Sequence, residues 1–95
     1  MRQFVITALD KKNVSDLRQQ HRDEHLLFLS SAKQWGVEII LAGPLLSGDD
    51  MIGSHLVLAA TDEMVIKNFL NADPYHQAGL FATTTIYPFK QVLPK

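Results

Sequence analysis

One histidine and one aspartate, each in a short polar cluster, form the smallest set in this chain that could move a proton. His25 lies in residues 22–26 (Arg-Asp-Glu-His-Leu), and Asp73 opens residues 73–75 (Asp-Pro-Tyr). Histidine titrates near neutral pH, with an unperturbed pKa of about 6.5, and a carboxylate bonded to one ring nitrogen determines which nitrogen carries the proton. The pair therefore predicts general acid–base chemistry, provided that the fold brings both side chains together.

Both residues also have purely structural explanations. His25 continues the apolar seam of a predicted helix, where a histidine can pack and hydrogen-bond a carbonyl or carboxylate group. An aspartate before proline is a favourable N-cap, so Asp73 is expected to cap a single helical turn over residues 75–77. Because a carboxylate has two oxygens, capping and proton transfer do not exclude each other. The sequence leaves both explanations open for each residue.

A zinc-peptidase pattern is also present in the first predicted helix. His21, Glu24 and His25 match H-x-x-E-H, and histidines four residues apart can reach the same metal ion. The pattern still needs a third ligand and a peptide cleft, and 95 residues are too few for the usual two-lobed peptidase. The chain also has no glycine-rich phosphate loop and no dinucleotide fingerprint. We therefore expect neither a metal site nor a cofactor.

Four further residues are candidates for substrate binding. Arg22 could bind an anionic group, although a surface salt bridge, worth about 0–1 kcal/mol, explains it equally well. Gly43, followed by Pro44, permits the close approach of a ligand or of another backbone. Tyr75 supplies either a hydroxyl group or ring surface. We assign Arg22, Gly43, Pro44 and Tyr75 to substrate binding as an expectation.

The first half of the chain must position His25. Residues 4–9 are predicted to form a strand that is apolar on both faces, because apolar residues occupy both alternating sets. Residues 14–35 are predicted to form one long helix whose apolar seam passes through both histidines and which ends at Gly36. A second strand is predicted over residues 37–45, stopped by the Gly-Pro pair at residues 43–44.

The second half must position Asp73. After a loop at residues 47–50, a third strand is predicted over residues 54–60. Thr61 is the expected N-cap of a second helix, which Pro74 limits because the residue before proline avoids helical geometry. Residues 81–89 are rich in threonine and aromatic residues, which favours a last strand.

The order strand, helix, strand, strand, helix, strand predicts one α+β domain, spanning residues 1–95. Two crossovers over a four-stranded antiparallel sheet give a ferredoxin-like βαββαβ layer, with the helices on one face of the sheet. The other face remains apolar, and a large exposed apolar face usually marks an interface. We therefore expect a homodimer in which two sheets close on each other.

Composition excludes several classes of function. The formal net charge is −1, with no basic stripe of the kind that nucleic-acid binding requires, so we expect no nucleic-acid partner. The longest apolar stretch, residues 37–46, is interrupted by Glu38 and by a Gly-Pro pair, so it is too short and too broken to span a bilayer. There is no cysteine, so disulfide and thiolate chemistry are excluded. No signal peptide is recognisable, and we expect a cytoplasmic protein.

Taken together in chain order, these short motifs resemble the YCII-related family. The resemblance covers nearly the whole chain, and His25 and the Asp-Pro-Tyr segment carry most of it. The matching positions are Arg22, His25 and Leu26, then Gly36, residues 42–45 (Ala-Gly-Pro-Leu), residues 73–75, residues 78–80 (Ala-Gly-Leu), and Ile86, Pro88 and Phe89.

The resemblance implies a dimeric α+β barrel, related in fold to muconolactone isomerases, with an active site that uses a histidine and an aspartate. By motif match these residues are His25 and Asp73. Where a reaction is attributed to the family, it resembles proton abstraction and elimination on ring-derived metabolites. Asp23 and Glu24 depart from the family pattern, which often has proline and a small residue before the histidine.

Three hypotheses follow for the function. The first is a cofactor-independent lyase or isomerase that acts on a small anionic or phenolic metabolite, with His25 as the base and Asp73 orienting it. The second is a non-catalytic module that binds a small ligand. The third is a structural or adaptor dimer, which needs no polar pocket beside His25. The sequence leaves open whether the chain is an enzyme.

Overall fold

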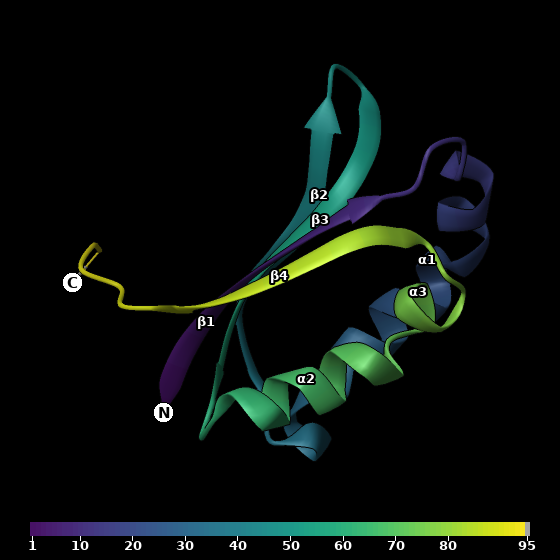
Figure 1. The fold of residues 1–95 in the computed structure, drawn as a ribbon. Coiled ribbons are helices and arrows are strands. Elements are labelled where there is room, and N and C mark those ends of the chain that lie inside the picture. The colour runs from purple at the N-terminus through teal and green to yellow at the C-terminus, as the bar shows by residue number, and fades with distance from the viewer. Residues whose placement is uncertain (95) are drawn as a thin grey trace.

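The computed structural model describes residues 1–94 as a four-stranded antiparallel sheet with helices on one face (Figure 1). The strand order across the sheet is β2-β3-β1-β4, which is the ferredoxin-like arrangement. The predicted α+β fold is therefore confirmed. The elements are β1 (Arg2–Asp10), α1 (Ser15–Ser30), the 3₁₀ helix η1 (Ala32–Trp35), β2 (Glu38–Ser47), β3 (Asp50–Ala60), α2 (Glu63–Ala72), α3 (Pro74–Gln77) and β4 (Phe81–Phe89).

The core lies between the sheet and the helices. On the central strand β1, Phe4 and Ile6 are fully buried, and they pair across the sheet with Leu58 and Leu56 of β3. From the helix side, α2 adds Phe69 together with Ile66 to the same cluster. Because side chains alternate along a strand, this pattern assigns one face of the sheet to the core and leaves the other face uncovered.

The predicted helix over residues 14–35 is wrong at its end, because α1 stops at Ser30 and a separate 3₁₀ turn follows. The hydroxyl groups of Ser30 and Ser31 each bond back to a carbonyl oxygen one turn earlier. Serine side chains that bond their own backbone compete with the continuing helix. Gly36 closes the 3₁₀ turn in the left-handed conformation, with φ 77°. Gly36 therefore ends the helical segment, as its position predicted.

The predicted stop at the Gly-Pro pair is also wrong, because β2 continues through Gly43 and Pro44 to Ser47. Proline lacks a backbone N–H and is confined to edge strands or bulges, and β2 is an edge strand. Pro44 still pairs in register with Ser54 of β3. The β2–β3 hairpin is consequently longer than expected and projects away from the rest of the sheet (Figure 1).

The second helix begins one residue later than expected, since Asp62 and not Thr61 is its N-cap. The Asp62 carboxylate accepts a hydrogen bond from the Val65 N–H at 3.1 Å. The helix ends at Ala72, next to Asp73. The last strand matches its predicted bounds, residues 81–89.

The uncovered face of the sheet carries apolar side chains from all four strands. Val5 of β1 points away from the core, and it pairs with Val57 of β3 on one side and with Tyr87 of β4 on the other. Leu41 of β2 extends the same row beside Val57. Both Leu41 and Tyr87 are more than half exposed. Within residues 1–94, no helix is both long enough and apolar enough to span a membrane.

Candidate active site

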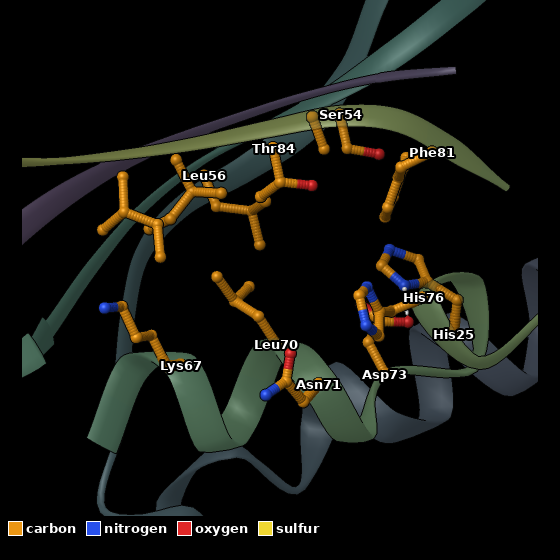
Figure 2. Close-up of a pocket in the computed structure, with 13 residues that line it drawn as sticks. His25, Ser54, Leu56, Lys67, Leu70, Asn71, Asp73, His76, Phe81 and Thr84 are labelled. Carbon is orange, nitrogen blue, oxygen red and sulfur yellow. Dashed lines mark hydrogen bonds and ion pairs between the residues drawn. The ribbon is translucent and has the colours of Figure 1, made fainter. Parts of the chain in front are cut away.

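The fold brings His25 and Asp73 into direct contact. The Nδ1 atom of His25 lies 2.8 Å from Oδ1 of Asp73, although the two residues are 48 positions apart in the sequence. His25 comes from the second half of α1, and Asp73 from the junction of α2 and α3. Both residues are buried, with exposed fractions of 7% and 4%. Figure 2 shows the pair on the helix side of a cavity, opposite the strands.

Backbone geometry explains why Asp73 is held so firmly. Its N–H closes α2 by donating to the Leu70 carbonyl at 3.2 Å, and its side chain is the N-cap of α3, where Pro74 fills the first position. The same Oδ1 that faces His25 accepts the Tyr75 N–H at 2.9 Å. The capping role and the contact with the imidazole therefore occur together, on one oxygen.

This arrangement determines the tautomer of His25. A carboxylate oxygen accepts hydrogen bonds, so the contact with Asp73 requires the proton of the neutral imidazole to be on Nδ1. The second nitrogen, Nε2, is then free to accept a proton. In Figure 2 this nitrogen points away from Asp73 into the space between the helices and the sheet. The geometry is that of a histidine base oriented by a carboxylate.

Tyr75 supports the histidine ring from one face. The two rings are stacked, with centroids 3.9 Å apart and planes 11° from parallel, and Phe81 forms a T-shaped pair with the phenol ring, with centroids 6.1 Å apart. Burial raises the pKa of the Tyr75 phenol above its ordinary value, although the positive charges of Arg18 and Arg22 oppose this shift. The phenol therefore stays protonated at neutral pH and carries no charge beside the imidazole.

Arg18 belongs to the site, and the sequence analysis missed it. This arginine is only 5% exposed and donates two hydrogen bonds to Asp10, at 2.8 and 2.9 Å, and one to Ser54 Oγ at 3.0 Å. Its guanidinium carbon also lies 4.8 Å from the centre of the Tyr75 ring, within the range of a cation–π contact. Burial opposes the charge of Arg18, but Asp10 and Tyr75 together outweigh this and raise the pKa of the guanidinium above its ordinary value.

A signal for Arg18 was available in its spacing. It precedes His25 by seven residues, or two helical turns, and therefore lies on the same face of α1. The predicted seam ran instead through apolar residues and the two histidines.

His21 is partly exposed, and its ring nitrogen lies 3.4 Å from Glu24. Within residues 1–94, no three His, Asp or Glu side chains lie close enough together to hold a metal ion.

Two cavities meet at His25. The larger cavity, of about 150 Å³, lies between α1 and the β2–β3 hairpin, and the smaller cavity, of about 70 Å³, lies between α2 and the inner face of the sheet. His25, Ser54 and Leu56 line both of them. In the smaller cavity, Lys67 and Asn71 of α2 face the sheet residues (Figure 2).

The four residues assigned to substrate binding all line the larger cavity. Arg22 is exposed at the α1 side, Gly43 and Pro44 form the hairpin side, and Tyr75 is buried beside His25. A Cβ atom placed on Gly43 would have no neighbour within 4 Å in the described chain, so no close backbone approach within this chain explains the glycine. The structure thus brings all six candidate site residues to one region; whether they bind a substrate stays a prediction.

Comparisons with known proteins identify relatives of the whole chain. The chain is 32% identical, over 98 residues, to an uncharacterized protein of Haemophilus influenzae, covering 94% of this chain and 97% of the relative. Among solved structures, it is similar to 5-chloro-2-hydroxyhydroquinone dehydrochlorinase from Burkholderia phenoliruptrix in complex with 2,5-dihydroxybenzoquinone. That similarity has a TM-score of 0.85 and 30% identity, and covers 93% of each chain.

A more distant similarity shows the fold alone. SnoaB, a cofactor-independent oxygenase from Streptomyces nogalater, superposes with a TM-score of 0.53 at 17% identity, covering 99% of this chain and 97% of that one. The model of the YCII-related domain matches residues 2–90. By its sequence and by its fold, the chain therefore belongs to the YCII-related domain family.

Proposed function

We propose that this chain is a cofactor-independent lyase or isomerase that abstracts a proton from a small anionic or phenolic metabolite. One observation carries the proposal: the 2.8 Å contact between His25 Nδ1 and Asp73 leaves Nε2 free beside a cavity. The dehydrochlorinase that is 30% identical to this chain is named for an elimination on a phenolic ring, which supports the same class of reaction.

In the proposed reaction, His25 Nε2 takes a proton from a carbon atom of the substrate. The electron pair of the broken C–H bond then forms a double bond to the neighbouring carbon. In a lyase, a leaving group departs from that carbon with its own electron pair. In an isomerase, that carbon instead gives up an existing π bond, and the displaced electron pair takes the proton back from the imidazolium at the next atom. Asp73 accepts the Nδ1–H and stabilises the imidazolium cation, and the stacked face of Tyr75 adds a favourable cation–π contact.

Charge that develops on the substrate needs a positive partner. Arg22 is exposed and lines the larger cavity, where its guanidinium can reach an anionic group. Gly43 and Pro44 supply the opposite wall. Proton transfer by a positioned group contributes roughly 10²–10⁴-fold to a rate, so binding and electrostatic stabilisation must supply the remainder.

We also propose that two copies pair through the uncovered face of the sheet. The row formed by Leu41, Val57, Val5 and Tyr87 crosses all four strands and has no helix over it. Burying such a face against a second copy removes apolar area from water, at roughly 25 cal/mol per Å². A cytoplasmic location stays a prediction from the sequence.

The experiment uses 5-chloro-2-hydroxyhydroquinone as the first compound, with other small phenols as a panel, and follows chloride release and the ring product. We expect His25→Asn and Asp73→Asn to lower turnover by roughly 10²–10⁴-fold. Asparagine is also a good N-cap, so Asp73→Asn should leave the start of α3 intact. His21→Asn is the matched control on the same helix and should retain full turnover.

Two outcomes would contradict the proposal. If His25→Asn and Asp73→Asn both retain full turnover of a compound that the wild-type chain converts, the base lies elsewhere. The second outcome is a compound that binds and is recovered unchanged. If His25→Asn then lowers only the affinity for that compound, the chain is a ligand-binding module instead.

A further inference from the structure

We infer that the pairing of two copies is controlled by pH through His55, which lies within the uncovered face of the sheet and has to be uncharged when a second copy covers it. The inference rests on the pairing proposed above and goes beyond it, because it names the residue that titrates and the direction of the change. Acid should separate the two copies.

The register of the strands places His55 on the uncovered face. Ser54, the residue before it on β3, is buried on the core side, and side chains alternate along a strand. Across the sheet, His55 pairs with Thr7 of β1 and with Gly43 of β2. His55 therefore stands one row along from the apolar row that contains Val57, in the middle of the face.

The groups around His55 on this face are neutral. Its Nδ1 atom lies 3.2 Å from the hydroxyl oxygen of Thr7. By strand register, its other neighbours are Val5, Leu9, Leu41, Leu45, Val57 and Thr85. Tyr87 of β4 lies in the Val57 row, and a phenol is uncharged at neutral and acidic pH. Glu38 of β2 pairs with Ala59, two rows from His55, so among the paired residues around His55 in the described sheet an imidazolium meets no carboxylate.

Covering the face changes the stability of the two protonation states unequally. In the separated chain His55 is only partly buried, so water still solvates an imidazolium there. Desolvation disfavours the charged form of an ionisable group, and a buried charge without a partner is costly. The separated copies therefore bind the proton more readily than the pair does, and by linkage the binding of protons favours separation.

A second copy of this chain suits the face because the face can meet itself without repulsion. No helix lies over it, since the helices cover the other side of the sheet (Figure 1). A two-fold interface places the same patch on both subunits, and at neutral pH the rows around His55 bring no like charges together. In acid each copy contributes one imidazolium, so repulsion between two positive charges adds to the cost of desolvation.

The size of the effect follows if neither histidine is protonated in the pair. For two histidines with the ordinary pKa of about 6.5, the dissociation constant of the pair should rise about 100-fold between about pH 8 and about pH 5.5. Separation then takes up two protons for each pair. A plot of the logarithm of the dissociation constant against pH should therefore approach a slope of about −2 at the acidic end.

The experiment measures the dissociation constant of the full chain by sedimentation across this pH range, at constant ionic strength. We expect the wild-type pair to weaken in acid as calculated. His55→Gln should pair at every pH with a nearly constant affinity, because glutamine is polar and does not titrate. His21→Gln is the matched control, since His21 lies on α1 on the helix side of the sheet and should keep the wild-type slope.

A second variant separates charge from other effects of acid. His55→Arg carries a positive charge at every pH used, so it should prevent pairing at neutral pH as well. Circular dichroism of each sample distinguishes separation from unfolding. If the chain unfolds near the acidic end, the interval from about pH 8 to about pH 6 is sufficient, because the expected change there is still roughly 15-fold.

The results that overturn the inference are distinct from those that overturn the pairing itself. If wild type and His55→Gln pair with the same dependence on pH, the pairing stands and the role of His55 is wrong. The role is equally wrong if acid tightens the pair, if His55→Arg pairs as well as wild type, or if His55→Gln fails to pair at neutral pH. A wild-type chain that stays monomeric at every pH overturns both proposals.

Discussion

The imidazole of His25 lies flat against the phenol ring of Tyr75, with the ring centroids 3.9 Å apart. The same tyrosine donates its backbone N–H to the Asp73 oxygen that faces His25. Asp73, Pro74 and Tyr75 are consecutive, so one short segment both orients the imidazole edge and covers its face. The Asp-Pro-Tyr motif is therefore a compact support for the histidine, with Pro74 fixing the backbone between the two contacts.

The first prediction concerns the stack. Tyr75→Phe should retain the stability of the chain because the ring remains, whereas Tyr75→Leu should lose the aromatic contact. The expected cost of the loss is about 0.5–1.5 kcal/mol beyond the change in buried area. Urea unfolding of the two variants measures it, and equal free energies of unfolding for Phe and Leu would contradict a role for the stack.

The second prediction concerns alkaline pH. The folded chain holds the Tyr75 proton more tightly than the unfolded chain, because burial raises the pKa of this phenol. Its stabilising contribution is therefore complete below the unfolded pKa of about 10, and is lost as pH rises through the folded value. The free energy of unfolding should fall with pH in that region, and Tyr75→Phe should reduce the slope.

The chain contains two tyrosines, which permits a direct control. Tyr87 is 65% exposed, so Tyr87→Phe leaves Tyr75 as the single phenol without disturbing the core. An ultraviolet titration of phenolate absorbance in this variant should give a pKa above the ordinary value. A pKa at or below about 10 would show that Arg18 and Arg22 outweigh burial.

The third prediction separates the two roles of Asp73. Asp73→Ala removes both the N-cap of α3 and the contact with His25, so it should lower the free energy of unfolding by about 0.5–2 kcal/mol and also abolish turnover. Asp73→Asn keeps a capping oxygen, so it should lower turnover with little loss of stability. Thermal unfolding and turnover, measured on both variants, check this. Similar unfolding temperatures for Ala and Asn would show that the cap contributes little.

The fourth prediction concerns the Arg18–Asp10 pair. Arg18→Met alone leaves the Asp10 carboxylate buried without its partner, and breaking a buried pair in this way costs about 3–5 kcal/mol. Adding Asp10→Asn should recover most of that stability, since a neutral pair has no unpaired charge. A double-mutant cycle from urea unfolding provides the measurement. Additive losses would mean that the two side chains are not coupled.

The fifth prediction concerns pairing of two copies. Tyr87→Glu places a charge in the uncovered face of the sheet, where it should oppose contact with a second copy and shift the protein toward the 10.7 kDa monomer. Met64→Glu is the matched control, because Met64 is 61% exposed on α2, on the helix side of the molecule. Sedimentation in dilute solution checks both variants. A wild-type chain that sediments only as a monomer would contradict the proposed dimer.

Several features could be predicted from the sequence because they depend on local chemistry. The order of strands and helices follows from apolar spacing, which reports which face of each element is buried. The left-handed turn at Gly36 and the cap at Asp73 depend on single residue types and their neighbours. Boundaries were less predictable: β2 continues through Pro44 only because it lies at the sheet edge, and strand order is not a local property.

The sequence by itself determined that one histidine and one helix-capping aspartate were available, and where each lies along the chain. Only the tertiary structure decided that a single Asp73 oxygen serves both the cap and the imidazole, and that Arg18 joins the site. The physical reason is that Arg18 takes its partners from β1 and β3, while His25 takes its partner from the end of α2. Contacts between residues so far apart in the chain arise from packing four elements, α1, α2, β1 and β3, around one core, and no local pattern encodes them.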